Sequence, residues 1–63
     1  MTTPRFTVYV ADGHYQFRTE FTGYYRAAMD VARKRAGENR EVMVTDWMGD
    51  VIWRAKGGGE AHA

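Results

Sequence analysis

The chain lacks cysteine, serine and leucine altogether. Without cysteine it has no disulfide, no thiolate nucleophile and no cysteine-type zinc site. Cysteine and serine are the commonest nucleophiles of covalent catalysis, and the remaining residues assemble no nucleophile, base and oxyanion donor. The two histidines, His14 and His62, have no metal-ligand spacing. We therefore expect a protein that is not an enzyme and that uses no metal and no cofactor.

Long apolar runs are also missing, since no segment approaches the roughly 18 residues that span a bilayer. Residues 1–5 lack the basic-then-apolar layout of a signal peptide, so we expect a cytoplasmic protein. Nine basic and eight acidic residues give a net charge of +1, without the basic excess typical of nucleic-acid-binding domains. A length of 63 residues predicts one small domain with a thin core. In the absence of leucine, that core must come from Val, Met, Ala and aromatic side chains.

Two alternating segments predict a first hairpin. Residues 5–10 alternate apolar and polar side chains with period two, which is typical of a strand with one buried face. An Asp-Gly pair at 12–13 favours a two-residue turn, and residues 14–20 alternate again. This register pairs Val8 with Phe17 and gathers the apolar side chains of both strands on one face. The opposite face would then carry Thr7, Tyr9, His14, Gln16 and Arg18.

A helix is predicted after this hairpin. Thr22 is the expected N-cap, and Gly37 is expected to end the helix. Apolar side chains recur at the i, i+3, i+4, i+7 and i+11 spacing of one helix face. They are Tyr25, Ala28, Met29, Ala32 and Ala36. Because most of them are small, this face can lie close to a sheet.

A second hairpin is predicted from two short apolar runs, 42–45 and 51–54. Its register is left open between two alternatives. A two-residue turn pairs Val44 with Trp53 and leaves Ile52 on the other face. A three-residue turn with a glycine at a bulge pairs Val44 with Ile52 and turns Trp53 outward.

Together these elements predict an α+β fold of ββαββ order, with one antiparallel sheet of about four strands and a single helix packed on one face. The sequence leaves the strand order open. Residues 1–56 form the predicted domain. Residues 57–63, which begin with three consecutive glycines, are expected to be a flexible tail.

Large apolar side chains outnumber what one helix can shelter. An alanine-rich helix of about fourteen residues covers one face of such a sheet, so we expect the uncovered face to expose either Ile52 or Trp53. Exposed apolar patches that contain aromatic and Arg side chains are typical of interfaces. The predicted partner-binding residues are Tyr9, Arg18, Met43, Trp47 and Trp53. The patch serves either a partner protein or the second copy of a homodimer.

A basic patch is predicted at the end of the helix and just beyond it. It consists of Arg33, Lys34, Arg35 and Arg40. Cations in the last turn of a helix complement its dipole, and a solvated helix end is the simpler explanation. With the sheet aromatics, the same cations suit a small nucleic-acid-binding domain, which is an alternative function.

Three segments, Tyr24–Arg33, Glu41–Asp46 and Gly49–Trp53, carry a resemblance to known proteins. Their layout, a helix followed by a hairpin, is similar to that of some small phage and mobile-element proteins, including certain anti-CRISPR inhibitors. The resemblance covers about half of the chain and includes no family-diagnostic motif. It implies a non-catalytic inhibitor that binds a host surveillance complex stoichiometrically in the host cytoplasm. A homodimeric structural subunit is a further alternative.

Overall fold

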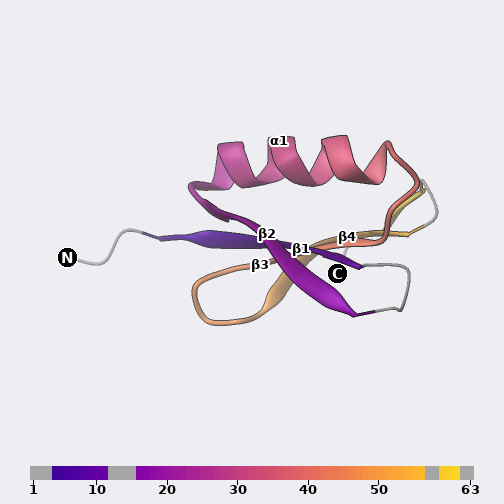
Figure 1. The fold of residues 1–63 in the computed structure, drawn as a ribbon. Helices are drawn as coiled ribbons and strands as arrows, with labels where there is room; N and C mark the ends of the chain where they lie inside the picture. Colours follow the sequence, from indigo (N-terminus) through magenta and orange to yellow (C-terminus); the bar gives the residue numbers. More distant parts are fainter. Residues whose placement is uncertain (1–3, 12–15, 57–58, 62–63) are drawn as a thin grey trace.

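The computed structural model describes residues 4–11, 16–56 and 59–61, and it shows one sheet with a helix on one face (Figure 1). The elements are β1 (Phe6–Ala11), β2 (Phe17–Gly23), α1 (Tyr25–Ala36), β3 (Val42–Thr45), β4 (Val51–Lys56) and β5 (Gly59–Ala61). The strands lie in the order β2-β1-β3-β4-β5, and all neighbours are antiparallel. The predicted α+β fold of ββαββ order, with one helix on one face, is confirmed.

The sheet gains a strand that the sequence did not predict. In β5, Gly59 pairs with Lys56 and Ala61 pairs with Arg54. Residues 59–61 therefore belong to the sheet rather than to a tail. The rest of the predicted tail, 57–58 and 62–63, lies outside the described residues.

Strand β1 lies between β2 and β3, so the connection from β2 through α1 to β3 passes over β1. This crossover places α1 above the centre of the sheet, as Figure 1 shows. The opposite face, which we call the open face, carries no helix of the described residues. None of the described helical structure is long and apolar enough to cross a membrane.

The core lies between α1 and the sheet. The largest side chains without solvent exposure are Val8, Val42 and Val44, and Ala28 and Ala32 of α1 are equally inaccessible. The other buried apolar residues are Val10, Met29, Ala36, Trp53 and Ala55. The core thus consists of Val, Ala, Met and an aromatic residue, as the leucine-free composition predicts.

The first hairpin forms, but its predicted register is wrong. Ala11 pairs with Phe17, and residues 12–16 connect them; residues 12–15 of that connection lie outside the described residues. Val8 pairs with Phe21, not with Phe17, because the register shifts and leaves Glu20 as an extra residue in β2. In a regular strand Phe17 and Phe21 would share a face, since they are four positions apart. The bulge at Glu20 changes this parity. Phe21 therefore packs against the core, and Phe17 lies on the open face.

The helix ends as predicted but starts later. Its N-cap is Tyr24, which makes no side-chain capping hydrogen bond. The predicted N-cap, Thr22, is wrong because this residue pairs with Thr7 in the sheet, where the two hydroxyl oxygens lie 3.3 Å apart. Gly37 is the C-cap, and its N–H donates to the carbonyl oxygen of Arg33 at 3.0 Å.

In the second hairpin Val44 pairs with Trp53, which confirms one of the two predicted pairings. The turn is longer than the two or three residues of the predicted alternatives, because Thr45 pairs with Val51 and leaves Ile52 as a bulge. Trp53 is 4% exposed, and Ile52 also packs against the core cluster. The prediction that one of these two side chains lies on the open face is therefore wrong. Because of the bulge, both side chains pack in or against the core.

Candidate functional site

Three elements meet at one end of the molecule: the start of β1, the start of α1 and the turn between β3 and β4 (left in Figure 1). Each contributes one aromatic ring. The ring of Phe6 contacts that of Tyr25 with centroids 5.2 Å apart at 74°, and that of Trp47 with centroids 5.6 Å apart at 90°. Edge-to-face pairs of this kind are worth about 0.5–1.5 kcal/mol each beyond their area burial. We call Phe6, Tyr25 and Trp47 the aromatic end cluster.

The aromatic end cluster is anchored in the core and open to solvent. Phe6 is half-buried and packs against the core, whereas Tyr25 is 53% exposed and Trp47 is 57% exposed. Tyr24 and Met48, next to them in the sequence, are 68% and 74% exposed. Large apolar side chains that gather on a surface in this way mark interaction sites.

Hydrogen bonds of the β3–β4 turn hold Trp47 in place. The Oδ1 atom of Asp46 accepts from the backbone N–H groups of Met48 and Asp50, both at 2.9 Å. The backbone N–H of Asp46 donates to the carbonyl oxygen of Asp50 at 2.9 Å. Gly49 has a φ of 87°, a left-handed conformation that glycine adopts without strain. The turn therefore presents Trp47 from a fixed backbone.

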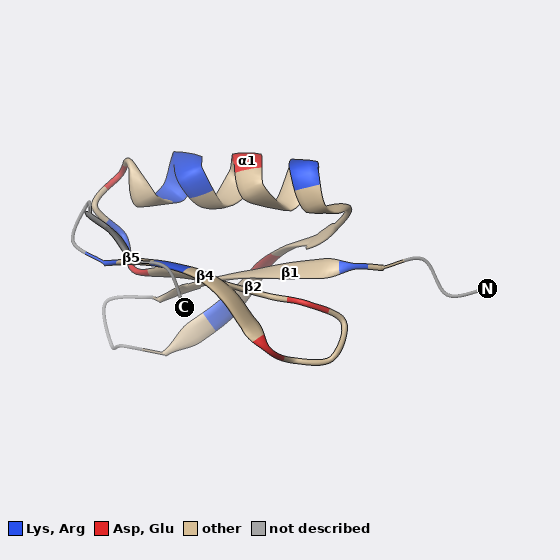
Figure 2. Cartoon of the chain, turned by 180° about the vertical axis from the view of Figure 1, so that it is seen from behind, with Lys and Arg blue, Asp and Glu red and all other residues tan. Residues whose placement is uncertain are grey.

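Charges of both signs surround the aromatic end cluster. Arg5 and Arg26 adjoin Phe6 and Tyr25 in the sequence, and both are exposed. Asp46 and Asp50 belong to the turn that carries Trp47. Figure 2 shows basic and acidic segments together at this end, on the right of that view. The rim of the cluster is therefore mixed in sign rather than basic or acidic.

The predicted partner-binding residues do not form one surface. Tyr9 and Met43 pair on the open face, where both are half-buried. Trp47 lies in the β3–β4 turn instead, where it contacts Phe6. Two placements are wrong. Trp53 is buried under α1, and Arg18 pairs with Val10, so it points to the helix side of the sheet.

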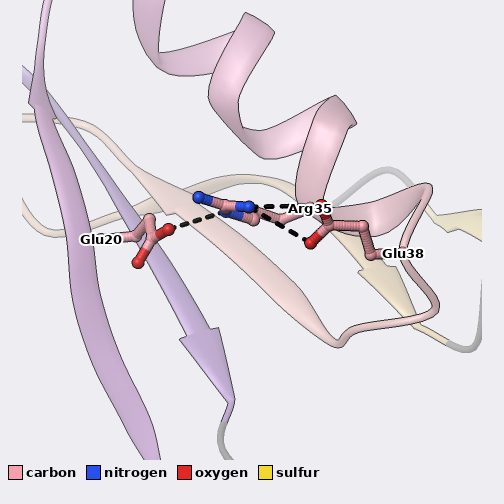
Figure 3. A network of polar contacts seen from close by, with 3 residues as sticks. All are labelled: Glu20, Arg35 and Glu38. Carbon is pink, nitrogen blue, oxygen red and sulfur yellow. Dashed lines mark hydrogen bonds and ion pairs between the residues drawn. The ribbon is translucent and has the colours of Figure 1, made fainter.

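The predicted basic patch is divided by ion pairs. Arg33 and Lys34 are exposed in the last turn of α1, and Arg40 is exposed beyond it. Arg35, however, donates to Glu20 of β2 at 2.7 Å and to Glu38 at 3.2 Å (Figure 3). The hydrogen bond to Glu20, and to a smaller degree that to Glu38, raises the pKa of Arg35 above its ordinary value. Arg35 therefore fastens the helix end to an edge strand.

The described residues contain no group of three His, Cys, Asp or Glu side chains that could hold a metal ion. His14 and His62 lie outside the described part of the chain. The raised pKa of Arg35 is explained by its structural ion pairs with Glu20 and Glu38.

Sequence reasoning missed Phe6 and Tyr25 as site residues, because the period-two and helical patterns assigned both to the core. One signal was present. Trp47 and Met48 are large apolar side chains in a turn, a position where small and polar residues dominate.

No protein-family model, curated protein or solved structure matches the chain.

Proposed function

We propose that this chain is a small protein-binding module that acts without catalysis and contacts its partner through the aromatic end cluster. The observation that carries the proposal is the exposure of Trp47 and Tyr25, each more than half open to solvent, at ring contacts with Phe6. Trp and Tyr are the residues that most often dominate binding energy at interfaces. Met48, 74% exposed, extends this surface with a flexible apolar side chain.

Rigidity supports the same proposal. Trp47 projects from a turn closed by the hydrogen bonds of Asp46, and Tyr25 projects from the first turn of α1. A partner that binds fixed side chains loses less conformational entropy than one that orders a loop. The aromatic end cluster is therefore pre-organised for contact.

The mixed charge of the rim favours a protein over the other partners. Arg5 and Arg26 would attract anionic lipid or nucleic acid, but Asp46 and Asp50 repel both. Protein interfaces commonly combine an apolar centre with a polar rim of both signs. A partner protein with its own charges of both signs fits this rim.

The resemblance to anti-CRISPR inhibitors remains a prediction about the partner's identity. It places a host surveillance complex at the binding surface and predicts that one chain per complex is enough for inhibition. Titration of the chain into such a purified complex, with target-DNA binding as the readout, tests it. Continued DNA binding at a molar excess of the chain would remove this partner while leaving the proposed surface intact.

Site-specific photo-cross-linking tests the surface itself. A photoreactive phenylalanine analogue replaces Trp47 in one variant and Lys34, an exposed residue at the far end of α1, in a matched control. Both variants are irradiated in the cells that produce them. We expect a discrete adduct from position 47 that is absent from position 34 and that is lost when Tyr25→Ala is added.

Equal adducts from positions 47 and 34, or none from 47, would overturn the proposal. The mass of the adduct identifies the partner. A mass of twice the chain assigns the aromatic end cluster to a homodimer instead of a protein-binding module.

A further inference from the structure

The open face carries two aromatic rings on adjacent strands. Tyr9 of β1 pairs with Thr19 of β2, and Ala11 pairs with Phe17. Tyr9 and Phe17 are therefore diagonal neighbours on one face, a relationship that places Cα atoms about 7–8 Å apart. Phe17 is 38% exposed and Tyr9 is partly exposed. Both rings lie on the side of the sheet away from α1.

Cations lie on the same face. Met43 pairs with Tyr9 on one side and with Arg54 on the other, so these three residues form a row across β1, β3 and β4. Lys56 follows two residues later in β4 and shares the face of Arg54. Both cations are exposed.

The ion pair of Arg54 leaves its positive charge accessible. Arg54 makes an ion pair with Glu41 at 4.0 Å, the outer limit for such a contact, and its side chain is 56% exposed. A pair at this distance, with its Arg54 side more than half open to solvent, contributes little stability, and Arg54 can also contact another anion. Arg54 and Lys56, with Glu41 beside Arg54, therefore carry a local net charge of +1.

We propose that the open face binds single-stranded nucleic acid, with bases stacked on Tyr9 and Phe17 and phosphates at Arg54 and Lys56. Rings on an open sheet reach bases only when these are unstacked from a duplex, and every base offers a face for stacking. Phosphates complement the two cations. This surface is distinct from the aromatic end cluster, and the inference does not depend on the proposed function.

Fluorescence anisotropy with labelled oligothymidine and oligouridine tests the inference, with a DNA duplex as comparison. We expect both single strands to bind more tightly than the duplex. Two phosphate contacts predict that the logarithm of affinity falls with the logarithm of salt concentration with a slope of about −1.4. Oligothymidine and oligouridine of equal length show whether the strand is DNA or RNA.

The variant Tyr9→Thr/Phe17→Thr removes both rings and keeps strand propensity, because threonine is β-branched. We expect affinity for the single strands to fall by about tenfold or more for each ring. Tyr24→Thr, which removes an exposed ring outside the open face, is the matched control and is expected to retain wild-type affinity.

A second variant keeps the inference testable if the Tyr9→Thr/Phe17→Thr variant does not fold. Arg54→Gln changes an exposed side chain and is expected to reduce the salt slope by about 0.7. Lys34→Gln, on α1, is the charge control with an unchanged slope.

Three results of the binding measurements would overturn the inference: no binding of either single strand at low salt, preference for the duplex, or wild-type affinity of a folded Tyr9→Thr/Phe17→Thr variant. Sedimentation of the same samples tests whether a second copy of the chain covers the open face instead. A concentration-dependent dimer that the ring variant dissolves, without oligonucleotide binding, assigns the open face to a second copy and also overturns it.

Discussion

Trp47, in the turn between β3 and β4, meets the ring of Phe6 at the start of β1 edge-on, with centroids 5.6 Å apart. This contact joins the turn to the body of the sheet. The other tryptophan has the opposite environment, since Trp53 is 4% exposed and packs in the core. The two tryptophans therefore divide the roles of surface and core between them.

This division predicts unequal effects on stability. Trp53→Ala leaves a cavity in the core and is expected to lower the free energy of unfolding by about 3–5 kcal/mol, which is most of the stability of so small a domain. Trp47→Ala removes one exposed ring and is expected to cost about 1 kcal/mol. Urea denaturation of the two variants measures both values. Similar losses for the two variants would contradict the assigned burial.

The small side chains of α1 predict a second difference. Ala32 has no solvent exposure and lies against the sheet, whereas Ala27 is exposed on the same helix. Ala32→Leu inserts a larger side chain where the helix and the sheet leave no space, and it is expected to lower the free energy of unfolding by about 1–3 kcal/mol. Ala27→Leu changes stability by less than about 0.5 kcal/mol. Thermal unfolding monitored by circular dichroism compares them, and equal melting temperatures would show that α1 does not pack closely on the sheet.

Asp46 is expected to control the β3–β4 turn. Asp46→Ala removes the acceptor of two backbone N–H groups and is expected to cost about 1 kcal/mol. Asp46→Asn keeps a side-chain oxygen at that position and is expected to retain most of the stability. Urea denaturation measures the two losses. Equal losses for alanine and asparagine would show that the hydrogen bonds of Asp46 do not stabilise the turn.

Arg35 is expected to stabilise the contact between α1 and β2. Arg35→Gln removes the ion pairs with Glu20 and Glu38 and is expected to lower the urea midpoint, more at low salt than at high salt. Arg33→Gln, with an exposed side chain in the same turn, is the matched control. The urea midpoint should fall further for Arg35→Gln than for Arg33→Gln. Equal midpoints for the two variants would contradict a stabilising role for the ion pairs of Arg35.

The direction of the Arg35 pKa fixes the pH range of this effect. Because folding raises the pKa of Arg35, its guanidinium stabilises the fold fully from neutral pH up to the pKa of Arg35 in the unfolded chain. The contribution is lost only as pH rises through the folded pKa, in strongly alkaline solution. Between neutral and moderately alkaline pH, the difference between wild type and Arg35→Gln is therefore expected to stay constant.

The sequence predicted the elements because their patterns are local. The alternation around Val8, the spacing of Ala28 and Ala32 and the stop at Gly37 depend on side chains a few residues apart, and all three hold in the structure. The same locality explains the core of Val and Ala. These features define the layers of the fold but not which aromatic side chains remain outside.

The side chains of the open face were predicted wrongly because two bulges change the parity of the strands. Glu20 separates Phe17 from Phe21, and Ile52 brings itself and Trp53 to the same core. A period-two reading has no means of locating an extra residue, since the bulge depends on pairing with another strand. The ring contacts of Phe6 equally depend on segments that are distant in the sequence.

Acrylamide quenching of single-tryptophan variants tests most directly the claim that Trp47 lies exposed in the aromatic end cluster while Trp53 lies in the core. Trp53→Phe leaves Trp47 as the emitter, and Trp47→Phe leaves Trp53. We expect Trp47 to emit at long wavelength with efficient quenching, and Trp53 to emit at shorter wavelength with weak quenching. Equal quenching of the two, or stronger quenching of Trp53, would contradict the account.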